Sequence, residues 1–279
     1  MSPTGPVRIG VALKWQSLRP EIDPLSGVVT LDERFMGASE SDRAALEWGL
    51  RLAEEWGGEV LAACAGPPAA EPMLRMALAV GAAHAIRCEL PDGASSVEAA
   101  TSLALVFHDV DVALCGDYSL DRGSGSVPAL LAAELDAAQA LGLIRLQAEE
   151  QGVVRAHRRL DGGRRERVRV RAPAVLSVEG GTARLRRASL SSALAAGRTE
   201  VPRCDPPTPA GDGHAHVLRP FRPRARALEP PDPSLPARER IRQLTGALSE
   251  RGTRQVVRVE PADGAEQLID ALRNWGYLE

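Results

Sequence analysis

The stretch from Cys115 to Leu135, CGDYSLDRGSGSVPALLAAEL, has residue types and spacing that could bind an anion. An apolar strand end leads into the Gly/Ser-rich turn Asp121 to Ser126, and an Ala/Leu-rich helical pattern follows over residues 127–135. Glycines permit close backbone approach, serine hydroxyls can donate hydrogen bonds, and a helix N-terminus offers unpaired N–H groups with partial positive charge. The spacing therefore favours a phosphate-binding turn, although similar turns elsewhere only cap helices.

The sequence shows no motif for other nucleotide-binding loops, metal sites or catalytic centres. The turn lacks the Gly-Lys-Ser/Thr of a P-loop, and no Gly-x-Gly-x-x-Gly follows the first predicted strand. The four cysteines have no paired spacing, and Cys64 and Cys115 are predicted to be small buried apolar residues. His214 and His216 have no third ligand nearby, so no metal is predicted. No paired acid and base and no nucleophile arrangement is found among the residues.

The elements that must position the turn alternate between strand and helix. Apolar runs predict strands over residues 7–13, 59–65, 83–90, 111–116 and 173–179, and helical periodicity predicts helices over 42–56, 72–80, 95–108 and 127–135. This order predicts an α/β fold, with a mostly parallel sheet and helices on both faces. A hairpin is expected where residues 153–160 and 165–171 flank Asp161-Gly162-Gly163.

The composition separates an α/β domain over residues 1–200 from a Pro-rich segment over 201–279. The second segment is expected to be an extended arm ending in a strand-like run, 256–260, and an amphipathic helix, 264–275. A loose tail is the alternative. The net charge of −3 is spread between interspersed acids and bases, which argues against nucleic acid. The N-terminus resembles no signal peptide and no run is long enough to span a membrane, so a cytoplasmic location is expected.

Several landmarks resemble the beta subunit of electron transfer flavoproteins. They occur in the family's order: VALK (11–14), Gly27-Val28-Val29, ASESDRAALEWGLRLAEE (38–55), GPPAAEPMLRMALAVGAAHAI (66–86), CGDYSLDRGSGSVPALLAAELD (115–136), RRASLSSALAA (186–196) and VVRVEPADGAEQLIDALRNWGYL (256–278). The stretch 66–86 is the most specific match. The resemblance covers essentially the whole chain.

The resemblance implies a heterodimer whose alpha subunit carries the redox-active FAD, while the beta subunit has an adenine nucleotide alpha-hydrolase-like fold and buries one AMP. Such a subunit passes electrons from flavin-dependent dehydrogenases towards a respiratory acceptor and is not itself an enzyme. The resemblance assigns the nucleotide to Ala12, Ser39, Glu40, Ser41, Asp42, Ala65, Gly123, Ser124, Gly125, Ser126 and Val127. It assigns contact with the dehydrogenase to a recognition loop near 184–197, through Leu190 and Leu194.

Departures from the family leave alternatives open. Ser39-Glu40-Ser41 replaces Asn-Pro-Phe, Asp117 replaces a basic residue and Pro128 replaces a glycine. The site could thus hold AMP, a second FAD as in electron-bifurcating relatives, or nothing. The departures and the arginine-rich composition suggest an actinobacterial, mycofactocin-associated branch. A free-standing adenine-nucleotide-binding protein of the same fold is the alternative class.

Two of the residue assignments have a purely structural alternative. Ala12 and Ala65 could be no more than small residues of buried strands, with no ligand beside them. Leu190 and Leu194 could face the core of the domain from an ordinary amphipathic helix.

Overall fold

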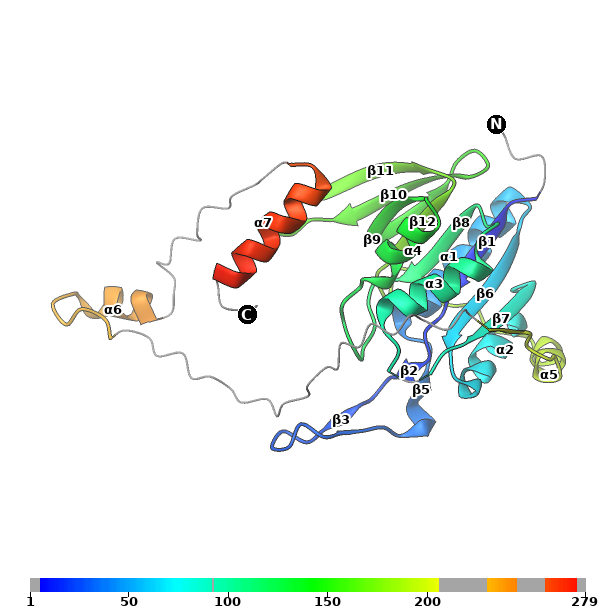
Figure 1. Cartoon of the computed structure of the whole chain (residues 1–279), viewed down its shortest axis with the longest axis horizontal. Coiled ribbons are helices and arrows are strands. Elements are labelled where there is room, and N and C mark those ends of the chain that lie inside the picture. Colours follow the sequence, from blue (N-terminus) through cyan, green and yellow to red (C-terminus); the bar gives the residue numbers. More distant parts are fainter. Residues whose placement is uncertain (1–5, 92, 206–229, 245–258, 275–279) are drawn as a thin grey trace. The chain divides into compact units, whose positions relative to one another are not determined.

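The computed structural model describes residues 6–91, 93–205, 230–244 and 259–274. The chain forms two compact units, Met1–Pro220 and Phe221–Glu279. The described part of the first unit contains a nine-stranded sheet with the order β11-β10-β9-β12-β8-β1-β6-β7-β13 (Figure 1). Its strands are β1 (Arg8–Ala12), β6 (Glu59–Gly66), β7 (His84–Glu89), β8 (Val112–Gly116), β9 (Ala138–Ala148), β10 (Val153–Arg159), β11 (Arg165–Arg171), β12 (Ala174–Val178) and β13 (Arg203–Cys204).

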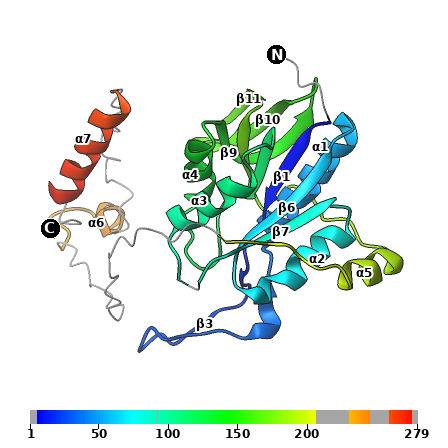
Figure 2. The same ribbon diagram turned by 45° about the vertical axis from the view of Figure 1, so that its right-hand side comes forward.

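The strands from β12 to β13 run parallel, and β9, β10 and β11 form an antiparallel meander at one end. The helices of this unit are α1 (Glu40–Trp56), α2 (Glu71–Ala79), α3 (Ser96–Val106), α4 (Val127–Glu134) and α5 (Leu190–Gly197). Helices α1 and α2 contribute to one apolar core, whereas α3 and α4 contribute to another. Adjacent strand residues divide between the two, with Val11 in the first core and Ala12 in the second. The predicted α/β sheet with helices on both faces is confirmed (Figure 2).

Helix α1 packs closely on the sheet because Gly49 has no side chain. A Cβ atom at this position would lie 2.6 Å from Val11 Cγ2 on β1. The helix begins at Glu40, two residues before the predicted start, because Ser39 and Asp42 form a capping box. Helix α3 begins in the same way, with a capping box formed by Ser95 and Glu98.

The predicted hairpin is confirmed, since β10 and β11 pair in antiparallel register on either side of residues 161–163. Strand β9, which the sequence analysis did not predict, lies between this hairpin and β12. Its pairing shifts register on both sides, and Gly142 within it has a φ of 66°. The Gly142 N–H donates to Ser177 Oγ of β12 at 2.9 Å. The irregularity explains why an alternating apolar pattern is absent from this strand.

Two short antiparallel ribbons follow β1. The first pairs β2 (Gln16–Ser17) with β5 (Met36–Gly37), and the second pairs β3 (Glu21–Ile22) with β4 (Val29–Thr30). In Figures 1 and 2 the β3 and β4 ribbon projects away from the main sheet.

The described part of the second unit contains α6 (Ala237–Leu244) and α7 (Pro261–Asn274). Helix α7 corresponds to the predicted terminal helix, and its Leu268 and Ile269 are exposed. Of the strand predicted over 256–260, only Val259 and Glu260 lie within the described residues, and they are not in a strand. Among the described helices, none combines the length and apolar character needed to cross a bilayer.

Candidate functional site

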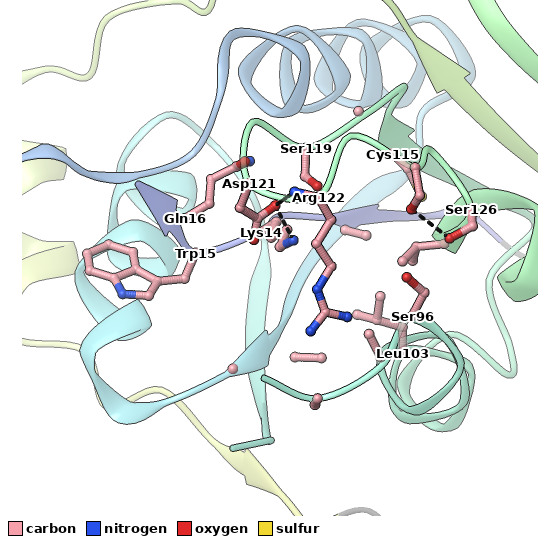
Figure 3. Close-up of a pocket in the computed structure, with 18 of the residues that line it drawn as sticks. Lys14, Trp15, Gln16, Ser96, Leu103, Cys115, Ser119, Asp121, Arg122 and Ser126 are labelled. Atoms are coloured by element: carbon pink, nitrogen blue, oxygen red, sulfur yellow. Dashed lines mark hydrogen bonds and ion pairs between the residues drawn. The ribbon is translucent and has the colours of Figure 1, made fainter. Parts of the chain in front are cut away.

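A pocket lies at the carboxyl ends of β1, β6 and β8 (Figure 3). Parallel α/β sheets commonly bind ligands at this edge, where loops leaving adjacent strands diverge. Its lining includes strand ends, three loops and the start of α4: Ala12, Lys14, Trp15, Gln16, Asp42, Ala65, Gly66, Leu90, Ser95, Ser96, Leu103, Cys115, Asp117, Asp121, Arg122, Ser124, Gly125, Ser126 and Val127. The pocket therefore combines an apolar floor with polar groups from separate segments.

The loop from β8 to α4 presents a helix N-terminus to the pocket. Ser126 is the N-cap residue of α4, yet its side chain makes no capping hydrogen bond and instead lies 2.9 Å from Ser124 Oγ. In contrast, the side chains of Ser39 and Ser95 cap α1 and α3. The side chain of Ser126 thus leaves the N–H groups of Val127 and Ala129 uncapped, while Pro128 between them has no N–H to donate, and the helix dipole favours an anionic ligand.

Gly125 is required at its position in this loop. Its φ is +60°, and a Cβ atom would lie 2.7 Å from the carbonyl oxygen of Asp117. A side chain would therefore be strained by the backbone conformation and would also collide with the turn. The glycine keeps the loop folded tightly against the end of β8.

Two cationic side chains line the same pocket, as Figure 3 shows. Lys14 Nζ lies 2.7 Å from Asp121 Oδ1, and the Arg122 guanidinium donates to the carbonyl oxygen of Gly93 at 2.8 Å. Partial burial works against ionisation of Asp121, but hydrogen bonds from Lys14 and Ser119 outweigh it and hold the pKa of this carboxyl below its usual value. The charge of Lys14 is thus offset by Asp121, whereas Arg122 adds to the positive potential that α4 supplies.

Asp42 is a buried carboxyl at the edge of the pocket. Its Oδ2 accepts hydrogen bonds from Gln16 Nε2 at 3.1 Å, Ser39 N–H at 3.1 Å and Ser39 Oγ at 2.8 Å. Burial raises the pKa of Asp42 to about 6, against the opposing effect of these hydrogen bonds. A Cβ atom at Gly116 would lie 2.8 Å from Asp42 Oδ1, so a side chain at this end of β8 would displace the Asp42 carboxyl.

The structure brings most of the nucleotide residues assigned from sequence to this pocket. Those in its lining are Ala12, Asp42, Ala65, Ser124, Gly125, Ser126 and Val127. Gly123 lies in the turn before them, outside the lining. Ser39, Glu40 and Ser41 line a neighbouring hollow, which shares Asp117 and Tyr118 with the pocket.

The sequence analysis missed lining residues in the segments that follow two other strands. Trp15 and Gln16 follow β1, and Leu90, Ser95 and Ser96 follow β7. Their only signal in the sequence is their position directly after predicted strands whose carboxyl ends meet at one edge.

Helix α5 lies within the predicted recognition loop and packs against α2. Ser189 caps it by accepting a hydrogen bond from Ser192 N–H at 3.0 Å. Leu190 is 77% exposed and Leu194 is 58% exposed. The alternative in which these leucines face the core of the domain is therefore wrong, and they form an apolar surface on α5.

A buried carboxylate fixes the segment that leads into α5. Glu47 of α1 accepts hydrogen bonds from Arg186 N–H at 3.1 Å, Arg186 Nε at 3.0 Å and Arg51 Nε at 2.8 Å. Desolvation works against ionisation of Glu47, but Arg186 and Arg51 outweigh it and hold its pKa below the usual value. Arg186 also pairs with Glu54, about two turns further along the same face of α1. The start of α5 is therefore fixed to α1 by a charged network.

Residues 28–209 match the electron transfer flavoprotein domain family. This match covers more than half of the 279 residues, and the chain belongs to that family. Its relatives include a protein named FixA from Rhizobium meliloti, which is 32% identical over 57% of this chain and 58% of its own length. An electron transfer flavoprotein subunit beta from Thermoanaerobacterium thermosaccharolyticum is 29% identical over 56% of this chain and 61% of its own length.

A longer match is found with an electron transfer flavoprotein subunit beta from Chromohalobacter salexigens. It is 26% identical over 73% of this chain and 75% of the relative. The alignments with the FixA proteins span about three fifths of those relatives. The resemblance identified from short motifs is thus confirmed at the level of the beta subunit family.

Proposed function

We propose that this chain is the beta-type subunit of a heterodimeric electron transfer flavoprotein, a carrier that passes electrons from a flavin-dependent dehydrogenase towards a respiratory acceptor. The family match supports this role. The structural observation that best supports this role is the pocket at the carboxyl ends of β1, β6 and β8. The start of α4, which no side chain caps, lines this pocket together with Lys14 and Arg122. The FAD belongs with an alpha-type partner and supplies the redox chemistry when bound.

The pocket fits an adenine nucleotide, and AMP is the proposed occupant. Ala12, Ala65 and Leu103 provide apolar surface suited to a base, while the α4 N-terminus provides donors suited to a phosphate. Asp42 and Gln16 are fixed to each other and offer polar atoms beside that surface. In this proposal the nucleotide holds three loops together and takes no part in electron transfer.

The exposed surface of α5 is proposed as the docking site for the dehydrogenase. Leu190 and Leu194 project from a short helix that the Glu47 and Arg186 network holds in place. Apolar side chains presented on a fixed element lose little entropy when a partner covers them, which suits them to anchor a transient complex. The segment 201–279 is proposed to be an arm that binds the alpha-type subunit through the apolar side of α7.

The decisive experiment is co-expression of the chain with the alpha-type subunit, followed by purification through a tag on the beta subunit. We expect a yellow heterodimer, and we expect acid extraction and mass spectrometry to release AMP in addition to FAD. FAD at two equivalents without AMP would assign the pocket to a second flavin. A colourless, monomeric protein that retains a nucleotide would contradict the carrier role and support the free-standing nucleotide-binding protein.

A further inference from the structure

Two cysteine side chains meet at the edge of the main sheet, away from the nucleotide pocket. Strand β13 pairs in parallel with β7, and the register places Cys204 opposite Cys88. Registered residues on neighbouring strands point to the same face, and strand spacing puts their Cα atoms about 4.8 Å apart. That separation lies within the range of about 4.4–6.8 Å that disulfides span. We propose that Cys88 and Cys204 are an oxidisable pair that closes into a disulfide across these strands.

The thiols have direct contact within one apolar cluster. Cys88 is fully buried, and Cys204 is partly buried against the same cluster. Burial, together with the adjacent Cys204 thiol, raises the pKa of Cys88 to about 12. Cys88 Sγ donates a hydrogen bond to the carbonyl oxygen of Ser102 at 3.3 Å, and this bond stabilises the protonated Cys88 thiol. Cys204 is therefore the thiol that an oxidant reaches first.

The other two cysteines cannot substitute for either member of the pair. Cys64 belongs to the core on the opposite face of the sheet. Cys115 shares a core with Cys88, but β1 and β6 separate its strand from β7. The register thus specifies one pairing among the four cysteines.

The oxidant in this proposal is hydrogen peroxide. The Cys204 thiol first releases its proton, and the thiolate then attacks one peroxide oxygen so that the O–O bond breaks. The departing hydroxide takes up the released proton and leaves as water, while Cys204 becomes a sulfenic acid. The Cys88 sulfur then attacks the Cys204 sulfur, the S–OH bond breaks, and a second water carries away the hydroxyl with the Cys88 proton. Two thiols lose two electrons and two protons in total, and one peroxide becomes two waters.

The disulfide would fix the chain where it leaves the sheet. Strand β13 has only two residues, and it is the last described element of the first unit. Without the disulfide, β13 is held by its hydrogen bonds to β7 and by the Arg87 N–H, which donates to the Pro202 carbonyl at 2.9 Å. An ion pair adds to this, with Arg203 Nη1 lying 3.6 Å from Glu89 Oε2. A covalent link would add a restraint that solvent competition cannot weaken.

The test is peroxide treatment of the full-length chain, followed by mass spectrometry without reductant. We expect loss of two hydrogen masses and a peptide linking Cys88 to Cys204. Cys204→Ser should abolish both, while Cys115→Ser, a matched control in the same core, should retain them. A tryptic cut after Arg203 should release the fragment beginning at Cys204 only after a reductant is added.

Three results would overturn the proposal. They are a linked peptide with another pairing, a disulfide between two copies of the chain, and sulfinic acid at Cys204 while Cys88 stays reduced. The half-buried position of Cys204 makes its serine variant compatible with folding, and the thermal unfolding of that variant checks this directly.

Discussion

Replacing Asp42 with asparagine should remove a pH dependence of stability that originates in its burial. The carboxyl has a pKa of about 6 in the folded chain against 3.8 for the unperturbed group. Each unit of difference corresponds to about 1.4 kcal/mol, so ionised Asp42 costs the folded state up to about 3 kcal/mol at neutral pH. Asparagine keeps an oxygen that can accept from Ser39 and Gln16 but does not ionise.

The sign follows from proton binding. Between about pH 4 and pH 6 the folded chain holds the Asp42 proton while the unfolded chain has released it. The contribution of Asp42 to the free energy of unfolding therefore decreases as the pH rises through this range, and it is constant above it. Subtracting the profile of Asp42→Asn from that of the wild type cancels the titration of the other groups.

The assay is urea unfolding of the isolated chain at a series of pH values. We expect the free energy of unfolding of the wild type, relative to Asp42→Asn, to fall by about 2–3 kcal/mol between pH 4 and pH 7. Asp121→Asn is a control, because hydrogen bonds from Lys14 and Ser119 hold the pKa of Asp121 below 3.8, so its contribution to the free energy of unfolding is lost only below about pH 4 and should be nearly constant between about pH 5 and pH 7. Parallel profiles for wild type and Asp42→Asn would refute the assignment of a buried, high-pKa carboxyl.

Four further predictions concern the proposed complex. Ser126→Asp should place a carboxylate at the start of α4 and lower the AMP content of the heterodimer at least tenfold by mass spectrometry; undiminished AMP would remove the phosphate assignment. Leu190→Ala should slow reduction by the dehydrogenase about tenfold with flavin content unchanged, whereas Val97→Ala, at an exposed position on α3, should not. Glu47→Gln should weaken the hold on Arg186, lower the melting temperature by a few degrees and slow the same reduction; normal transfer with lowered stability would show that the network does not position α5. Truncation after Asp205 should abolish recovery of the alpha-type subunit and leave the melting temperature of the isolated chain unchanged, and the reverse pair of results would contradict the arm.

Much of the fold was predictable because the local signals agree with the long-range order. The strand of residues 7–13 is apolar on both faces, as a central parallel strand requires, and the Asp161-Gly162-Gly163 turn specifies its hairpin locally. Strand β9 was not predictable in this way. It changes from parallel pairing with β12 to antiparallel pairing with β10, and the shift at Gly142 interrupts the alternation of its side chains.

The site was predictable only in the segments that a motif covers. The Gly/Ser turn indicated a ligand by itself, because its chemistry lies in consecutive residues. Lys14, Trp15 and Gln16 join the pocket through the sheet order, which places β1 beside β6 and β8. That order depends on long-range pairing, to which a single sequence gives no direct access. The exposure of Leu190 likewise depends on how α5 packs against α2, which periodicity alone does not determine.

Helix α1 positions two separate surfaces, the pocket and the segment before α5, and this affects how mutations in the protein should combine. Near its N-terminus Asp42 borders the pocket, and five residues later, about 7.5 Å along the axis, Glu47 holds the segment before α5. Gly49, two residues after Glu47, packs so closely on Val11 of β1 that the helix cannot move towards the sheet. A substitution that tilts the helix to suit one surface displaces the other, so the effects of paired changes at Asp42 and Glu47 should be non-additive. The effect of a mutation on ligand retention should therefore depend on mutations that alter partner recognition, because the same helix positions both surfaces.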